Sequence, residues 1–457
     1  MLARAAAYHA DAAAPEAAVL AAAAWLSARR AALRAAARAH QTFGAVGITT
    51  EGPLFHITRR IRQWASLALG ETSAEAALAE RAGLSMMRLF GPEEQAFRGE
   101  VRAFLADWAD LDAYLCHGPK WPRVAALFRA LGERGWLSLA WPKEQGGLGL
   151  GPSFEYILWD EVAYARAARN PLATIVARTL LRAGTEAQRA RWLPPIRAGA
   201  LHFALGYSEP EAGSDLASLR TRAVRRGGVY VIDGDKCWQS YAGHVEALWL
   251  LARTGEPGSR GGGLSLFIVD RASPGLTVTK LPTLDGDALY ACRFEGVEVP
   301  AERRVGAEHG AWQLMSEALA DERHIQFPAG RLKRDLDELV SWLRESGRDR
   351  DAFIRRELAE LAVRVLEAEV LALRVVELTQ AGRSAVVEAA ANKVFHTELC
   401  QEIAGRAFAW GGTESLVTGS RAQQLWLQSL WETIGGGSSE VMRGVVAKQG
   451  LGLGGRA

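Results

Sequence analysis

The chain has 457 residues, of which 49% are hydrophobic and 23% are charged, and its formal net charge is only +2. This length predicts two or three folding units with sizeable cores. The balanced charge, without Lys/Arg-rich runs interleaved with aromatic residues, argues against a nucleic-acid partner. No apolar run reaches the 18 residues that a membrane span needs.

The positions of the cysteines and histidines argue against disulfide bonds and metal sites. Cys116, Cys237, Cys292 and Cys400 are scattered without paired spacing, which is typical of reduced thiols in a cytoplasmic protein. The nine histidines form no HxxxH or Cys/His cluster, so no metal site is expected. The Ala-rich N-terminus favours helix over a signal peptide, with a transit peptide as the alternative.

The N-terminal region has a composition that favours helices. Residues 2–10 and 16–40 are dominated by Ala, Leu and Arg, and Pro15 between them suits a helix start. Gly44 interrupts the pattern, and Pro53 fits the first turn of the next helix. Three helices are therefore predicted before a linker: one at 2–10, one at 16–40 and one whose first turn contains Pro53.

The rest of the chain changes character twice. Residues 70–86 are small and polar and predict a linker, after which amphipathic helical segments continue to residue 200. From residue 202 to about residue 300, short β-branched runs broken by Gly, Pro and Asp predict a compact β-domain. The expected strands are VYVIDGDKCW, ALWLLART, LSLFIVD, LTVTKLP and CRFEGVEVP, and the helices expected after them are 311–346, 350–382 and 385–408.

Two polar loops carry the clearest chemical signal. The first, 207–215, reads YSEPEAGSD and offers the hydroxyls of Ser208 and Ser214; the second, 238–243, offers the aromatic wall of Trp238 and the hydroxyl of Ser240. Glycines and small hydroxyl residues let backbone approach a flat, phosphate-bearing ligand. Either loop alone is typical of an ordinary Gly/Ser turn, whereas the pair favours a ligand site.

The pair SEPEAGSD and KCWQSYA resembles the flavin-binding motifs TEPxAGSD and KxWITNA of the acyl-CoA dehydrogenase family. The resemblance implies bound FAD, with Ser208 facing the flavin ring and Ser214 near the pyrophosphate and the substrate. It also implies that Trp238 packs along the isoalloxazine and that Ser240 bonds near flavin N5. Leu205 departs from the family, because many members carry an aromatic residue there.

Residues 87–457 resemble this family from end to end. The tail IGGGSSEVMRGVVAKQGLGL is similar to YEGTSEIQRNIIAxxxLGL, which implies cofactor contacts at Gly437 and Ser439. The segment QTFGAVGITTEG resembles QxxGGxGFTxE, which normally lies in the last domain, and it implies further cofactor contacts at Gln41 and Gly44.

The expected fold is α+β and mainly α. It has an N-terminal helical domain, a central β-barrel or sandwich and a C-terminal four-helix bundle, preceded by an extra partial helical bundle. The domain boundaries expected are 1–69 for the partial bundle, 70–86 for the linker, 87–201, 202–304 and 305–457.

The family's reaction needs a carboxylate beside the substrate α-carbon. Gly436 stands where many members carry the glutamate of YEGT, whereas ALADERHIQFPAG resembles a second pattern, LxxERxxxA. The resemblance makes Glu322 the expected base and Arg323 a substrate-side residue, with Asp321 and Glu432 as lesser candidates. The alternative for Glu322 is a solvated helical carboxylate paired with a neighbouring arginine.

The resemblance implies FAD-dependent α,β-dehydrogenation of an acyl thioester such as acyl-CoA, with electrons passed to an electron-transfer flavoprotein or a similar acceptor. The segment LRESGRDRDAFIRRELAEL lacks the FG and Gln of RxxFGxxLxxFQ, and Arg355 or Arg356 is the candidate replacement. This loss resembles family members that work as heteromers, including actinobacterial-type enzymes of steroid side-chain breakdown. The alternatives are a non-catalytic subunit that completes a partner's flavin site, and another flavin reaction such as an oxidase.

Overall fold

The computed structural model describes residues 1–12, 14, 16–43, 49, 53–66, 78, 90–113, 118–169 and 171–454. The chain divides into two compact units. Unit 1 comprises residues 1–89 and 332–373, and unit 2 comprises residues 90–331 and 374–457. Among the described residues, no helix combines the length and the apolar character that crossing a membrane requires.

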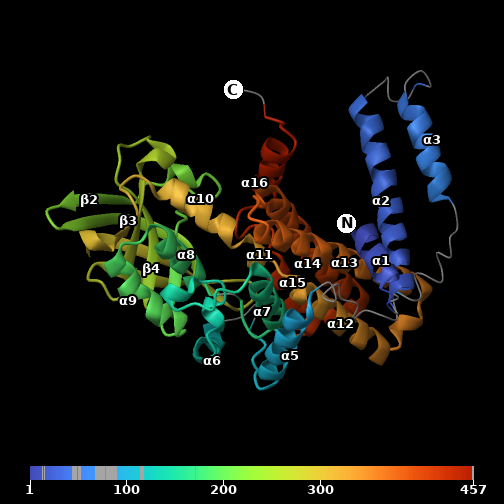
Figure 1. Ribbon diagram of the computed structural model, residues 1–457, viewed down its shortest axis with the longest axis horizontal. Coiled ribbons are helices and arrows are strands. Elements are labelled where there is room, and N and C mark those ends of the chain that lie inside the picture. Colours follow the sequence, from blue (N-terminus) through green and yellow to red (C-terminus); the bar gives the residue numbers. More distant parts are fainter. Residues whose placement is uncertain are drawn as a thin grey trace. The chain divides into compact units, whose positions relative to one another are not determined.

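Unit 1 is helical, as its composition predicts. Its N-terminal helices are α1 (Leu2–Asp11), α2 (Ala17–Phe43) and α3 (Pro53–Ala65), with α2 packed against both of the others (Figure 1). Arg30 of α2 donates hydrogen bonds at 2.5 Å to both carboxylate oxygens of Glu367 in α13 (Ala352–Gln380). The predicted helices at 2–10 and 16–40 are confirmed, whereas Pro15 and Gly44 lie outside the described residues.

Unit 2 begins with helices that surround a buried one. Every side chain of α7 from Glu155 to Ala163 is buried, including three carboxylates. Gly151 caps this helix and Pro152 opens it, a position that does not need the missing N–H. The helices of this region are α5 (Pro92–Ala106), α6 (Trp121–Glu133), α7 (Pro152–Tyr164), α8 (Ala173–Ala183) and α9 (Glu186–Arg197).

The central domain is one mixed sheet with strand order β6-β7-β3-β2-β4-β5-β8, and β1 pairs with β4 in parallel. Every residue of β4 is buried, because alternate side chains enter two cores. Trp249 faces the core shared with α8 and α9, and Leu250 faces the core shared with β3 and β7. The strands are β1 (Phe203–Gly206), β2 (Arg222–Arg226), β3 (Val229–Ser240), β4 (Ala247–Arg253), β5 (Leu264–Asp270), β6 (Leu276–Pro282), β7 (Ala288–Pro300) and β8 (Arg304–Val305).

All five predicted β-runs are confirmed, and β2 is the main strand beyond them. Its sequence is RAVRR, in which only Ala223 is buried. It therefore lacks the apolar alternation that marks a strand.

The predicted continuous helix at 311–346 is wrong. The chain forms α10 (Ala311–Asp321), α11 (Arg323–Gln326) and α12 (Gly330–Glu345), with Glu322 between the first two. Pro328 explains the second break, because it disfavours helical backbone at Phe327 and lacks an N–H of its own. The chain then continues through α13 to α14 (Val386–Gly411), α15 (Arg421–Ser429) and α16 (Ser439–Val445), and α15 and α16 both pack on α14 (Figure 1).

Gly330 joins α12 to the buried helix α7, and this contact gives a matched stability test. A Cβ at Gly330 would lie 1.8 Å from the carbonyl oxygen of Asp160, whereas a Cβ at Gly99 in α5 would meet nothing within 4 Å. We expect Gly330→Ala to lower the free energy of unfolding by about 1–3 kcal/mol or more. Gly99→Ala should raise it by about 0.5–1 kcal/mol, because alanine is the better helix former.

Urea denaturation of both variants measures the two effects. Equal stability changes in the two variants would mean that the chain at Gly330 is not packed against α7.

Candidate functional site

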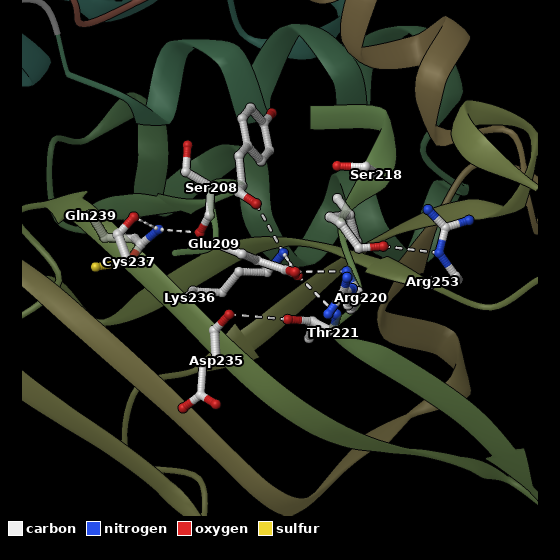
Figure 2. Close-up of polar contacts among 12 residues, drawn as sticks. Ser208, Glu209, Ser218, Arg220, Thr221, Asp235, Lys236, Cys237, Gln239 and Arg253 are labelled. Carbon is white, nitrogen blue, oxygen red and sulfur yellow. Dashed lines mark hydrogen bonds and ion pairs between the residues drawn. The ribbon is translucent and has the colours of Figure 1, made fainter. Parts of the chain in front are cut away.

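The structure brings the two predicted loops together. The carbonyl oxygen of Ser208 accepts a hydrogen bond from the backbone N–H of Cys237 at 2.9 Å and one from Nε2 of Gln239 at 3.3 Å (Figure 2). A Cβ at Gly213 would lie 3.8 Å from the ring of Trp238. The first loop therefore lies along the end of β3, where the second loop begins.

Trp238 is turned outward by an irregularity in β3. The pairing of β3 with β7 shifts register between Lys236 and Gln239, and Trp238 has a φ of +67°. A β-bulge of this kind re-aims a side chain. The indole consequently remains 48% exposed although it stands at the end of a central strand. Left-handed backbone at a non-glycine residue costs about 1–2 kcal/mol, so the surrounding structure must hold this conformation.

A buried ion pair beneath the loops supplies that support. Nζ of Lys236 donates to an oxygen of Glu209 at 3.0 Å and to the carbonyl of Tyr207 at 2.9 Å. The backbone N–H groups of Arg220 and Thr221 donate to Glu209 at 2.6 and 2.8 Å (Figure 2). The ion pair therefore fixes the start of the first loop, and the segment that follows this loop, to the strand that leads to the second loop.

The charge state of this pair follows from its burial. Burial lowers the pKa of Lys236 to about 8, although Glu209 offsets part of the effect. Burial by itself would raise the pKa of Glu209, but the positive charge of Lys236 and the hydrogen bonds from residues 220 and 221 bring it below its ordinary value. Both groups are therefore ionised at pH 7.

Arg253 of β4 holds the segment that follows the first loop. Its Nε donates to the carbonyl of Leu219 at 2.9 Å, and its Nη2 donates to the carbonyl of Ala217 at 2.9 Å. Figure 2 shows this side chain beside the segment that contains Ser218 and Arg220. A charged group thereby satisfies backbone carbonyls that would otherwise be buried without partners.

The residues of the two loops fit a flat, phosphate-bearing cofactor. Ser208 and Ser240 are half-buried, Ser214 is exposed, and the broad face of Trp238 is held open to solvent. Hydroxyl donors and an exposed aromatic side chain in neighbouring loops are typical of a ligand site. The roles predicted for these residues in binding a cofactor stay predictions.

The other predicted cofactor residues lie elsewhere in the fold. Gly437 has a φ of +94° just before α16, and Ser439 at the start of α16 is buried, with no hydrogen-bond partner for its Oγ in the described structure. Gln41 is exposed near the end of α2, and Gly44 lies outside the described residues. The roles of these four residues stay predictions.

Glu322, the expected base, is a buried carboxylate. It is fully buried at the junction of α10 and α11, and Oε1 is 3.6 Å from Nε of Arg178 in α8. Burial raises the pKa of Tyr207, and the negative charge of Glu322 raises it further. Because the carboxylate of Glu322 is fully buried, it is not the solvated helical carboxylate of the alternative interpretation.

Arg178 belongs to a buried cluster that the sequence did not reveal. Its Nη2 donates to both oxygens of Glu155 at 2.7 and 2.8 Å, and Nε2 of His324 lies 2.9 Å from Glu155 Oε2. Burial would raise the pKa of Glu155, but Arg178 and the hydrogen bond from His324 hold it at about 2.

The lesser candidates for the base differ from Glu322 in their surroundings. Glu432 pairs with Arg169 at 2.6 Å and also with Arg331. Burial opposes its ionisation, but the two guanidinium groups hold its pKa at about 2, which makes it a weak base. Gly436 has a φ of +68°, a conformation that a glutamate rarely adopts. The side chains of Asp321 and Arg323 lie outside the described residues.

One missed residue had a signal in the sequence. Tyr230 and Ile232 point inward from β3, and Lys236 follows at an inward position of the same strand. A lysine there requires a buried counterion, which the acidic first loop supplies. Arg178 and Glu155 had no such local signal, because their partners lie on other helices.

Three family models match the chain. The acyl-CoA dehydrogenase N-terminal domain matches residues 91–200, the middle domain matches residues 204–297, and the C-terminal domain matches residues 309–451. Acyl-CoA dehydrogenase FadE29 of Mycobacterium tuberculosis is 35% identical over 387 residues, which cover 79% of this chain and 97% of the relative. FadE26 of the same organism is 36% identical over 350 residues, which cover 71% of this chain and 86% of the relative.

Solved structures resemble the chain over the same region. A structure described as the Tcur3481-Tcur3483 steroid ACAD has a TM-score of 0.75 and is 31% identical in sequence. The similarity covers 80% of this chain and 99% of the chain in that structure. The ChsE4-ChsE5 complex from Mycobacterium tuberculosis has a TM-score of 0.72 and 32% identity with the same coverage.

The Lys236–Glu209 pair gives a stability test of the site. We expect Lys236→Met and Glu209→Gln each to lower the free energy of unfolding by about 3–5 kcal/mol, because each leaves the other charge of the pair buried without its counterion. The double variant should lose less than the sum of the two. Arg220→Gln is the control, because the Arg220–Glu211 pair is 3.1 Å long but exposed and should contribute little. Strict additivity in urea denaturation would contradict the coupling.

Proposed function

The chain belongs to the acyl-CoA dehydrogenase family, and from this membership we propose that it dehydrogenates the α,β bond of an acyl thioester with Glu322 as the base. Members of the family are FAD-linked oxidoreductases that act on CH–CH groups. The observation that carries the proposal is the full burial of the Glu322 carboxylate at the junction of α10 and α11, where it lies 3.6 Å from Nε of Arg178.

The proposed role of Glu322 is to accept the α-proton of the thioester. A base that is fully buried is shielded from water, so its proton affinity is set by neighbouring groups instead of solvent. Arg178 at 3.6 Å favours the ionised form, which is the form that can accept a proton. FAD, when bound, supplies the acceptor for the hydride that leaves the β-carbon.

The two loops would hold that cofactor. Trp238 offers an exposed aromatic face, and Ser208 and Ser240 offer hydroxyl donors at its edge. Ser214 is proposed to serve the pyrophosphate and the substrate, and Arg323 to lie on the substrate side. Gln41, Gly44, Gly437 and Ser439 remain proposed cofactor contacts on the family pattern alone.

The partners are proposed at the level of class. The similarity to the Tcur3481-Tcur3483 and ChsE4-ChsE5 structures supports a hetero-oligomer and a bulky, steroid-like acyl group. An electron-transfer flavoprotein or a similar protein is the proposed electron acceptor, and a cytoplasmic location stays a prediction. A non-catalytic subunit is the alternative, favoured by the glycine at position 436 in place of the usual glutamate.

Removing the carboxylate tests the base. Glu322→Gln should keep the flavin but slow anaerobic flavin reduction by an acyl-CoA panel by about two to four orders of magnitude. Glu317→Gln is the control, since this half-exposed carboxylate lies on the preceding helix and pairs with Arg182 at 2.8 Å. If the flavin of Glu322→Gln is reduced at the normal rate, the base is another residue, and Glu432 is the next to test. A wild-type protein that binds flavin but is never reduced would favour the non-catalytic subunit.

Flavin content tests the loops. The variant Trp238→Ala/Ser240→Ala loses an aromatic face and a donor, so its affinity for FAD should fall roughly tenfold or more. Flavin absorbance per polypeptide and its spectral position measure the change. Trp312→Ala removes another exposed indole, 39% accessible on α10, and should leave both unchanged. Full occupancy with an unaltered spectrum in the double variant would reject the assignment.

A further inference from the structure

Three side chains from three helices, Arg178, Glu155 and His324, form a chain of polar contacts that starts at Glu322. Oε1 of Glu322 faces Nε of Arg178 at 3.6 Å, and Arg178 in turn donates to both oxygens of Glu155. Glu155 also lies 2.9 Å from Nε2 of His324. His324 follows Glu322 by two residues on α11, so the chain of contacts returns to the segment from which it starts.

The geometry around Arg178 separates two functions of one guanidinium group. Its Nη2 makes hydrogen bonds of 2.7 and 2.8 Å to Glu155, which fix the position of the side chain. Its Nε stands 3.6 Å from Glu322, beyond hydrogen-bond range but close enough for a strong charge interaction. Arg178 therefore favours the anion of Glu322 through its charge, at an Nε–Oε1 separation longer than a hydrogen bond.

We propose that Arg178 is a positioning residue that keeps Glu322 ionised and oriented, and that Glu155 and His324 hold Arg178 in place. This inference rests on the proposed role of Glu322 as the base. The charged and titratable groups around Glu322 include Arg178 from α8 and Tyr207 from the first loop, with Glu155 from α7 and His324 from α11 behind Arg178. Among these groups, Arg178 is the cation in direct ion-pair contact with Glu322.

A purely structural role for Arg178 gives a different expectation. If the guanidinium group only neutralised Glu155, its loss would lower stability but leave the titration of Glu322 unchanged. If it also governs Glu322, its loss makes the carboxylate bind a proton more readily. The pH dependence of the reaction therefore distinguishes the two roles, and stability alone does not.

The experiment compares Arg178→Gln, Arg178→Lys and the wild-type holoenzyme. The rate of anaerobic flavin reduction by acyl-CoA is measured as a function of pH. In Arg178→Gln, the pH midpoint of the rate should move upward by about one unit or more, with at least a tenfold loss of rate below it. Arg178→Lys retains the charge but not the planar guanidinium group, so its midpoint should lie between those of the wild type and Arg178→Gln. An unchanged midpoint in Arg178→Gln would overturn the proposal.

A second test of the proposal changes His324 and leaves Arg178 in place. His324→Gln preserves a donor to Glu155 and should keep the wild-type midpoint, whereas His324→Leu should shift it in the same direction as Arg178→Gln. The matched control is Arg182→Gln, one turn along α8, which breaks the Arg182–Glu317 pair at the surface. If Arg178→Gln does not fold, an unchanged midpoint in both Arg178→Lys and His324→Leu would overturn the proposal.

A readout independent of turnover separates this proposal from the assignment of the base. Infrared difference spectra of the holoprotein with ¹³C-labelled glutamate follow protonation of carboxyl groups, and Glu322→Gln identifies the band of Glu322. We expect that band to titrate at higher pH in Arg178→Gln than in the wild type. If Glu322→Gln still reduces flavin normally but the band shifts, the base assignment fails and the positioning by Arg178 stands. If Glu322→Gln is inactive and the band does not shift, only the positioning fails.

Discussion

The structure of unit 2 depends on the neutralisation of three carboxylates on the buried helix α7. Glu155, Asp160 and Glu161 are 8%, 0% and 2% exposed, on a helix that is apolar on its other faces. A buried carboxylate without partners would destabilise the fold by several kcal/mol, so other elements must approach closely enough to bind each one. The partners are Arg178 and His324 for Glu155, the backbone N–H of Gly330 for Asp160, and Arg98 and Arg102 for Glu161.

The same principle builds the candidate site. Glu209 is a second buried carboxylate, and its cation Lys236 ties the first loop to the strand from which Trp238 projects. Through Glu155, helix α7 fixes Arg178, and Arg178 faces Glu322. The proposed base and the proposed cofactor loops are thus held from two directions by ion pairs with little or no exposure to water. In such surroundings small changes of position have large electrostatic effects, which is why positioning matters here.

Much of the fold and part of the site follow from local sequence. The five β-runs, the helices at the N-terminus and the two serine loops are visible because each depends on residues close together in the chain, such as the alternation in LSLFIVD. The break at Glu322 and the bulge before Trp238 were not predictable in this way. The bulge holds Trp238 in a left-handed conformation that contacts with other segments must stabilise, and no local pattern marks the helix break at Glu322. The Arg178–Glu155–His324 contacts join residues as far as 169 positions apart, and no local pattern encodes them.

The long sequence separation of the α7 contacts also has a consequence for synthesis of the chain on the ribosome. The partners of Glu155 and Asp160 at His324 and Gly330 are translated 169 and 170 residues later. At typical elongation rates this delay is roughly 10–30 s. During that interval α7 lacks these two partners, while the whole β-domain, which lies between them in the sequence, is translated. Chaperone binding to ribosome-attached intermediates is therefore expected to concentrate on this helix and to end when α12 emerges.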